Sequence, residues 1–330
     1  MAFFDNAVTS EQVVSAFAPQ VKGRVFVITG AGQPSIGSSI AVELAKASPS
    51  HILIASRTAE NVYPVLSAIR EEDTSVKATF VPVDLSDHDS VLRAAQEILA
   101  ATRSQIDVLI NSAGNMALKE YTVDKQGIEM QMSVNHVGHF LLTNLLKPAL
   151  LAGAANPYGA RVINITSVGY QISPVRYGDV SFSSGKAYDM WAGYGQAKTA
   201  QILFSYGLTD RLKHRGVVAF ACHPGSNLDT KLGSHLVMDD YSGIMPVTQR
   251  NTGQDFVFTV GDEPRFKTYE QIGATPLIAA LDPGLATRAP AYLQNGQIMQ
   301  PTAQHALYNA IEVEKCWKLS EKLVGQSFMY

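Results

Sequence analysis

The sequence predicts an α/β protein built on one Rossmann-type, doubly wound parallel sheet. Two observations support this prediction. Short apolar runs rich in β-branched residues alternate with amphipathic segments between positions 24 and 222, a pattern typical of βαβ units. The first apolar run also ends in a glycine-rich turn that leads into a helical pattern, as nucleotide-binding folds of this class do.

Composition narrows the class of protein further. The chain has 330 residues, of which 46% are hydrophobic and 17% charged, enough for a sizeable buried core. A net charge of −3 gives no electrostatic reason to expect nucleic acid or an anionic membrane as a partner. No apolar run is long enough to span a membrane, and the N-terminus does not have the pattern of a secretory signal. We therefore expect a soluble, cytoplasmic protein.

The first part of the chain predicts a regular order of elements. Residues 1–22 form a lead-in with one short helix at 10–17, and residues 23–330 form a single domain. The predicted strands lie at 24–30, 51–55, 77–83, 106–111, 161–166 and 217–222. The predicted helices between them lie at 36–46, 59–72, 87–102, 124–151 and 195–214.

The alternation breaks after Pro224-Gly225. Residues 226–269 show little periodicity, and an irregular segment of this length inside a compact domain is usually functional or disordered. We expect it to form a lid over a substrate. Helical patterns return at 269–280 and at 302–323, where the second is an amphipathic tail helix.

The glycine-rich turn runs from Gly30 to Gly37 and includes Gly32 and Ile36. Gly30 permits a tight turn, and Gly37 allows the helix to pack closely on the strand, so that the helix N-terminus faces a pyrophosphate. A plain glycine-rich loop is the structural alternative.

The end of the second predicted strand carries Ser56 and Arg57 where an acidic residue would bind the ribose hydroxyls of NAD. A guanidinium instead pairs with the 2′-phosphate of NADP. This position favours NADP(H), although a solvated charge at a strand end is the alternative.

Tyr194 and Lys198 are four residues apart. On a helix this spacing places the phenol and the ammonium on one face, where the ammonium would lower the pKa of the phenol. Such a tyrosine can donate or accept a proton. The pair alone is a weak motif, because it occurs on many amphipathic helices.

Several motifs in order resemble the short-chain dehydrogenase/reductase family over roughly residues 22–325. They are Thr29-Gly30, Asp84-Leu85, Asn111-Ser-Ala-Gly114, Asn135, Ser167, Tyr194 with Lys198, and Pro224-Gly225. The stretches 134–142 and 267–293 are similar to the retinol-dehydrogenase-like and WW-domain-oxidoreductase-like branch, which includes many fungal pathway reductases. The resemblance implies hydride transfer between NADPH and a carbonyl carbon.

The family resemblance implies a role for each matching residue. Ser167 would hydrogen-bond the substrate oxygen, and Tyr194 would act as the general acid. Lys198 would bind the nicotinamide ribose and lower the tyrosine pKa, and Asn135 would hold a water that links the lysine to solvent.

The resemblance also implies a set of cofactor contacts. Asp84 would bind the adenine, Asn111 and Gly114 the adenosine ribose, and Pro224-Gly225 with Thr230 the nicotinamide amide. The expected cofactor-binding set is Gly30, Gly32, Ile36, Gly37, Ser56, Arg57, Asp84, Leu85, Asn111, Ala113, Gly114, Tyr194, Lys198, Pro224, Gly225 and Thr230. No metal is expected, since His136 and His139 lack a third ligand and Cys222 and Cys316 are predicted to be free thiols.

The sequence also departs from the family pattern. Pro34-Ser35 stands where the middle glycine of the turn usually lies, and the loop is one residue longer. Ser167 and Tyr194 are 27 residues apart, so residues 168–193 form an extra loop. The expected pocket walls are Tyr170, Val175, Tyr177, Trp191, Leu236, Met238, Tyr241, Ile244 and Met245.

These residues favour a bulky apolar substrate, such as a secondary metabolite. The alternatives are an NADP-dependent alcohol dehydrogenase of retinol or steroid type, a reductase that also assists a cyclisation, and a catalytically silent NADP-binding regulator. The long helices of this family form homo-oligomers, but the tail helix could cover those faces here.

Overall fold

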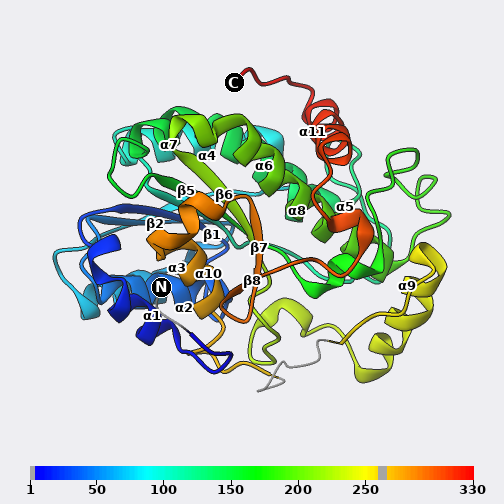
Figure 1. The fold of residues 1–330 in the computed structure, drawn as a ribbon, viewed down its shortest axis with the longest axis horizontal. Helices are drawn as coiled ribbons and strands as arrows, with labels where there is room; N and C mark the ends of the chain where they lie inside the picture. The colour runs from blue at the N-terminus through cyan, green and yellow to red at the C-terminus, as the bar shows by residue number, and fades with distance from the viewer. Residues whose placement is uncertain (1–3, 259–265) are drawn as a thin grey trace.

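The structure is a computed structural model that describes residues 4–258 and 266–330 and contains one eight-stranded sheet (Figure 1). Its strand order is β3-β2-β1-β4-β5-β6-β7-β8, and every neighbouring pair is parallel except β7 and β8. The strands are β1 (Val25–Thr29), β2 (His51–Ser56), β3 (Lys77–Pro82), β4 (Val108–Asn111), β5 (Ala160–Ile165), β6 (Val217–Cys222), β7 (Ala291–Gln294) and β8 (Gln297–Met299). The order reverses between β1 and β4, which is where doubly wound sheets bind ligands. The predicted fold class and the six predicted strands are confirmed.

Helices cover both faces of the sheet (Figure 1). One layer contains α2 (Ile36–Ala45), α3 (Ala59–Glu72) and α10 (Ala274–Leu281), and the other contains α4 (His88–Ala101), α6 (Gly138–Leu145), α7 (Lys147–Gly153) and α8 (Met190–Leu212). Each helical layer encloses a hydrophobic core against one face of the sheet. Successive residues of a strand point into opposite cores, so that Phe26 and Ile28 pack against the first layer and Val27 packs against the second.

The N-terminal lead-in is part of the first layer. Helix α1 (Ser10–Ala16) begins at Thr9, whose side chain accepts a hydrogen bond from the Gln12 N–H in a capping box. Val13 and Val14 are buried in the core that α2 and α10 share. The predicted short helix is therefore confirmed, and it is anchored to the domain.

The predicted helix at 124–151 is wrong at its start. Asp124 instead makes a turn, because its Oδ1 accepts hydrogen bonds from Gln126 N at 2.8 Å and Ile128 N at 2.9 Å, and Gly127 has a φ of +79°. Glu129 then caps α5 (Met130–Met132), which runs into the π-helical segment η2 (Ser133–Val137) and on to α6. The helical path is thus widened at Asn135, and π-helical turns of this kind are frequent at functional sites.

Helix α8 begins at Met190, five residues before the predicted start. Asp189 caps it by accepting hydrogen bonds from Trp191 N at 2.9 Å and Ala192 N at 3.0 Å. The correction places Tyr194 inside the helix rather than just before its first residue.

The segment 226–269 contains more structure than predicted. It includes the short 3₁₀ turns η5 (Lys231–Gly233) and η6 (Met238–Gly243) and the helix α9 (Ile244–Thr252). Residues 259–265 lie outside the described chain. Helix α10 begins at Ala274, later than the predicted 269. The hairpin of β7 and β8, joined by Asn295-Gly296, was not predicted.

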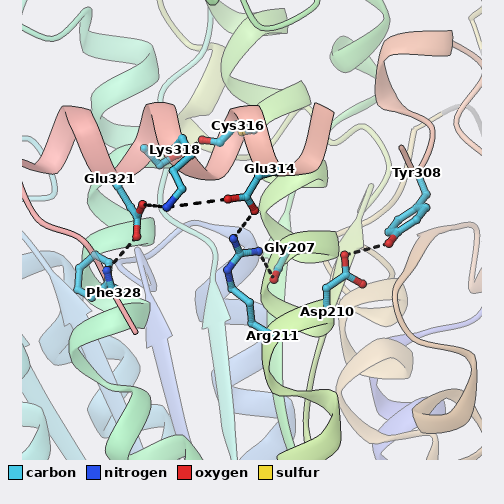
Figure 2. Close-up of polar contacts among 10 residues, drawn as sticks. Gly207, Asp210, Arg211, Tyr308, Glu314, Cys316, Lys318, Glu321 and Phe328 are labelled. Carbon is cyan, nitrogen blue, oxygen red and sulfur yellow. Dashed lines mark hydrogen bonds and ion pairs between the residues drawn. The ribbon is translucent and has the colours of Figure 1, made fainter. Parts of the chain in front are cut away.

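The tail helix α11 (Ala310–Val324) begins eight residues later than predicted, at the cap residue Asn309. It packs on α8 at Gly207, where an added Cβ would meet Trp317 Cε3 at 3.1 Å. Figure 2 shows the ionic contacts at this interface: Arg211 Nη2 lies 2.5 Å from Glu314 Oε2, and Lys318 Nζ lies 2.8 Å from Glu321 Oε2. The tail helix thus covers a face of α8, as the sequence suggested.

Candidate active site

A cleft of about 620 Å³ runs along the carboxyl ends of four adjacent strands, β3, β2, β1 and β4. Ten of the residues predicted to bind the cofactor line it. They are Gly30, Gly32, Ile36, Ser56, Arg57, Asp84, Leu85, Ala113, Gly114 and Thr230. These residues come from five separate stretches of sequence, and the fold brings them to one surface.

The glycine-rich turn is fixed by close contacts. Gly30 has a φ of +67°, and an added Cβ would lie 2.5 Å from Ala113 Cα, so a larger residue would collide with the loop after β4. A Cβ at Gly37 would lie 3.0 Å from Ala31 Cα. Ser35 caps α2 through a capping box with Ser38. The turn therefore presents the N-terminus of α2 to the cleft without the usual middle glycine.

The far end of the cleft carries the polar groups after β2 and β3. Arg57 is exposed and lines the cleft beside Ser56 and Thr58. Asp84 is held by Ser86, whose backbone N–H and hydroxyl donate to Asp84 Oδ1 at 2.9 and 2.6 Å. A cation and a fixed carboxylate thus lie in one cleft, as expected for binding of an adenosine phosphate.

Asn111 does not lie where the resemblance implies. Its side chain is fully buried, and its Nδ2 donates to Thr143 Oγ1 at 3.1 Å and to Asn164 Oδ1 at 2.8 Å. The amide therefore points into the core between β4, β5 and α6. This corrects the expectation that Asn111 lines the adenosine ribose.

Pro224 and Gly225 also lie outside the residues that line the cleft. Gly225 has a φ of +100°, and an added Cβ would lie 2.5 Å from Lys267 Cγ. The turn after β6 therefore packs against the chain at Lys267, and only Thr230 of the three expected nicotinamide contacts lines the cleft.

None of Tyr194, Lys198 and Ser167 lines this cleft, but a Cβ on the lining residue Gly114 would lie 4.0 Å from Lys198 Nζ. Both helical residues are buried, and Lys198 Nζ lies 5.5 Å from the centre of the Tyr194 ring. Ser167 caps the turn η3 (Val168–Ile172), which packs against the Tyr194 ring at Gly169. The spacing of four residues therefore places the two groups on one face of α8, as predicted.

The protonation of this pair differs from the expectation. Burial raises the pKa of Tyr194 to about 12, and the hydrogen bond with Ser167 only partly opposes this rise. Burial also lowers the pKa of Lys198 to about 7. Lys198 Nζ donates to Ile165 O at 3.1 Å and to Gln201 Oε1 at 2.9 Å rather than to the phenol. The predicted lowering of the tyrosine pKa by the lysine is therefore wrong for this arrangement.

Asn135 is fully buried in the π-helical turn. Its Oδ1 accepts from Asn115 N at 3.1 Å, and its Nδ2 donates to Asn115 O at 3.1 Å and to Gln131 O at 2.9 Å. A Cβ on Gly114 would lie 2.5 Å from Asn135 Oδ1 and 4.0 Å from Lys198 Nζ. Asn135 thus connects the cleft-lining loop with the lysine.

Two glycines that the sequence did not single out allow this arrangement. A Cβ on Gly169 would lie 2.7 Å from Tyr194 Cε1, and a Cβ on Gly195 would lie 2.8 Å from Ser173 N. The turn that holds Ser167 can approach α8 only because both positions lack a side chain. The pair Tyr194-Gly195 in the sequence could have signalled such a close approach.

The expected pocket walls separate into two groups. Trp191 lies 6.4 Å from Tyr194 and 5.4 Å from Tyr241 between ring centres, and its Nε1 donates to Asp240 O at 2.8 Å. Ile244 is buried in the same apolar cluster, and Leu236 packs against it. Trp191 therefore links Tyr194 to the segment 226–269.

The second group does not wall this site. Tyr170 and Val175 are buried in a different cluster with residues of α11, and Tyr177 donates to Glu312 O at 3.1 Å. Met238 is exposed, at 85%, so it contacts little of the chain. The extra loop therefore splits between the site and the support of the tail helix.

The remaining sequence predictions concern metals and thiols. Cys222 and Cys316 are free and buried, as predicted. His136 and His139 are buried, and each contacts a neighbouring side chain, Ser320 for His136 and Thr29 for His139. Within residues 4–258 and 266–330, no three His, Cys, Asp or Glu side chains are grouped to hold a metal ion. None of the described helices combines the length and apolarity needed to cross a membrane.

Comparisons with known proteins give matches to one protein family. The family model described as short chain dehydrogenase matches residues 24–239. Oxidoreductase fscI of Fusarium equiseti is 31% identical over 244 residues, which cover 67% of this chain and 94% of the relative. Retinol dehydrogenase 12 of Mus musculus is 32% identical over 306 residues, which cover 93% of this chain and 88% of the relative.

Solved structures share the fold. A structure from Beutenbergia cavernae, assigned as an NAD(P)-dependent gluconate 5-dehydrogenase and containing bound NADP, is 26% identical with a TM-score of 0.60. It covers 82% of this chain, and the match covers 94% of that chain. The span of the family model includes the glycine-rich turn, Asn135, Ser167, Tyr194 and Lys198.

Proposed function

Because the chain belongs to the short-chain dehydrogenase family of oxidoreductases, we propose that it is an NADPH-dependent reductase of ketones or aldehydes. The observation that carries this proposal is the buried Tyr194 phenol, which shares one face of α8 with Lys198 and packs against the turn that holds Ser167. Lys198 in turn lies near Gly114, which lines the cleft of about 620 Å³. Relatives and structural neighbours support a nicotinamide cofactor.

The cleft fits such a cofactor on its own residues. Gly30, Gly32 and Ile36 line the cleft, and the capped N-terminus of α2 faces it, where its free N–H groups suit a pyrophosphate. When bound, the nicotinamide supplies the hydride. We assign the adenine end to Asp84 and the 2′-phosphate to Arg57, since no carboxylate follows β2.

Tyr194 and Ser167 would hold the carbonyl oxygen of the substrate. As negative charge develops on that oxygen, Ser167 donates a hydrogen bond and Tyr194 donates its proton. The raised pKa of Tyr194 keeps the phenol protonated at neutral pH, so the proton is available for reduction. Lys198 and Asn135 would orient the nicotinamide ribose next to this pair.

The substrate we propose is a bulky apolar small molecule, such as a secondary metabolite. Trp191 and Ile244 share an apolar cluster with Tyr194, and Tyr241 packs against Trp191. Apolar walls of this kind favour apolar ligands. The second candidate is the oxidation of a retinol-type or steroid-type alcohol, which the similarity to retinol dehydrogenase 12 favours. Coupled cyclisation and a silent NADP-binding regulator are further alternatives.

The experiment compares the wild type with Tyr194→Phe on a panel of ketones and aldehydes. Consumption of NADPH is followed at 340 nm, and the product is identified by mass spectrometry. We expect the loss of the proton donor to lower kcat by about 10²-fold or more, with little change in NADPH binding. Wild-type-like turnover by Tyr194→Phe would contradict the proposal. A product with a new ring would favour the cyclising alternative.

A further inference from the structure

Two buried histidines, His136 and His139, connect the π-helical segment that contains Asn135 to different parts of the protein. His136 Nε2 lies 2.6 Å from Ser320 Oγ on α11. His139 contacts Thr29 at the end of β1 through Nε2, at 2.8 Å, and contacts Asn135 O through Nδ1, at 3.0 Å. Both rings are at most 1% exposed. Of these two histidines, His139 is therefore the one that links Asn135 to Thr29, the residue before the glycine-rich turn.

The hydrogen bonds around Thr29 fix the proton on His139. Thr29 Oγ1 accepts from Ser112 N at 3.0 Å and from Ala113 N at 3.1 Å. These two bonds use both lone pairs of the hydroxyl, so its own proton is donated to His139 Nε2. A neutral imidazole that accepts at Nε2 carries its proton at Nδ1. His139 Nδ1 therefore donates to the Asn135 carbonyl.

Charge supports the same assignment. Burial, opposed in part by the hydrogen bond to Asn135 and assisted by the charge on Lys198, lowers the pKa of His139 to about 4. The ring is thus neutral at physiological pH, with one donor and one acceptor. Both are used, which leaves no polar atom of this ring unpaired.

The two hydrogen-bond partners of His139, Thr29 and Asn135, bind opposite ends of the loop 112–115 at the cleft. Thr29 binds the N–H groups of Ser112 and Ala113, and the Asn135 side chain binds the N–H and carbonyl of Asn115. Gly114 lies between these anchors and lines the cleft. A shift of the π-helical turn would therefore move Asn135 and the cleft wall together.

We propose that His139 is a positioning residue that joins Thr29 to the Asn135 carbonyl and so sets the distance between Asn135, Gly114 and Lys198. This inference rests on the proposed function for its effect on turnover. It assigns no contact with substrate or cofactor to His139. Of the two hydrogen bonds of His139, we expect turnover to require the one to the Asn135 carbonyl.

Three variants separate this role from general stability. His139→Leu removes both bonds. His139→Asn keeps the donor to Asn135 O, because Asn144 on the same helix donates to Phe140 O at the same spacing, at 2.7 Å. His136→Leu is the matched control, since it removes a bond from the same turn to α11 only.

We expect His139→Leu to lower kcat at saturating NADPH at least tenfold, measured where circular dichroism shows each variant folded. His139→Asn and His136→Leu should stay within about threefold of the wild type. The inference is overturned if folded His139→Asn is as slow as His139→Leu, or if His136→Leu is as slow as either.

A second measurement keeps the two proposals distinguishable. If the wild type binds NADPH but reduces no carbonyl in the panel, the proposed function fails, and hydrogen exchange at Ser112 and Ala113 decides the role of His139. Faster exchange at these amides in His139→Leu than in His136→Leu supports the inference. Equal exchange in the two variants overturns it.

Discussion

Gly169→Ala tests whether the close approach of the η3 turn to α8 sets the catalytic geometry. The new Cβ would lie 2.7 Å from Tyr194 Cε1 and 3.0 Å from Cδ1, whereas ordinary contact begins at 3.4 Å. The ring must therefore retreat by about 0.7 Å, the difference between 3.4 and 2.7 Å. A misplacement of about 1 Å can reduce a rate about 10²-fold. We expect kcat/KM for the carbonyl to fall about 10- to 100-fold.

The control for this variant is Gly178→Ala in the same extra loop, because an added Cβ there meets nothing within 4 Å. Turnover of carbonyl with NADPH is measured for both variants, and NADPH binding is measured by fluorescence. Binding should change little, since Gly169 does not line the cleft. Gly169→Ala with wild-type kcat/KM, in folded protein, would refute the geometric reasoning.

Two further predictions concern cofactor choice and pH. Arg57→Ala should raise the KM for NADPH about 10- to 100-fold and leave the KM for NADH nearly unchanged, because a hydrogen bond to a charged group contributes about 1.5–3 kcal/mol. Arg70→Ala on α3 is the control. An equal effect of Arg57→Ala on the KM values of both cofactors would contradict the assignment of Arg57 to the 2′-phosphate. Burial raises the pKa of Glu129 to about 7, so its protonated form favours the folded state. This stability is fully present below the unfolded pKa near 4.5 and is lost as the pH rises through 7, up to about 3 kcal/mol. The free energy of unfolding, measured with urea, should therefore depend less steeply on pH between pH 5 and 8 in Glu129→Gln than in the wild type. Identical slopes in the two proteins would exclude a raised pKa of Glu129.

The parallel core could be predicted because its signal is local. Strands buried on both faces appear as continuous β-branched runs, as in β1 and β6. Asn295-Gly296, both with positive φ, is the usual signature of a two-residue hairpin turn. The hairpin of β7 and β8 was missed because its strands are only four and three residues long.

The errors at helix ends also have local causes. Asp189 is a good helix cap that could have been read from the sequence, but Gly193 and Gly195 lower the helix propensity of the first two turns of α8. The turn at Asp124 competes with the helix because its carboxylate binds backbone N–H groups. In both cases a side chain decided the boundary, whereas hydrophobic periodicity had been used to predict it.

The position of a site residue could be predicted where its place on a strand, turn or helix alone determines it, as for Gly30 and Tyr194. They could not be predicted where a partner distant in sequence decides the direction of a side chain. Asn111 follows β4 as expected, yet its amide turns to Asn164, 53 residues later, and leaves the cleft. His139 likewise acquires its contacts from Thr29, 110 residues earlier. Such pairings depend on the packed fold, because the core must satisfy each buried polar group.

The protonation of the Tyr194–Lys198 pair bears on which proton transfer the buried phenol can make. A lysine that holds the phenol as a phenolate would suit the oxidation of an alcohol, since the phenolate accepts the proton. Here burial acts on both groups and favours their neutral forms, with the pKa of Tyr194 raised to about 12 and that of Lys198 lowered to about 7. The phenol therefore holds its proton at neutral pH while Ser167 orients it. A protonated phenol can donate to a carbonyl oxygen, as the proposed reduction requires.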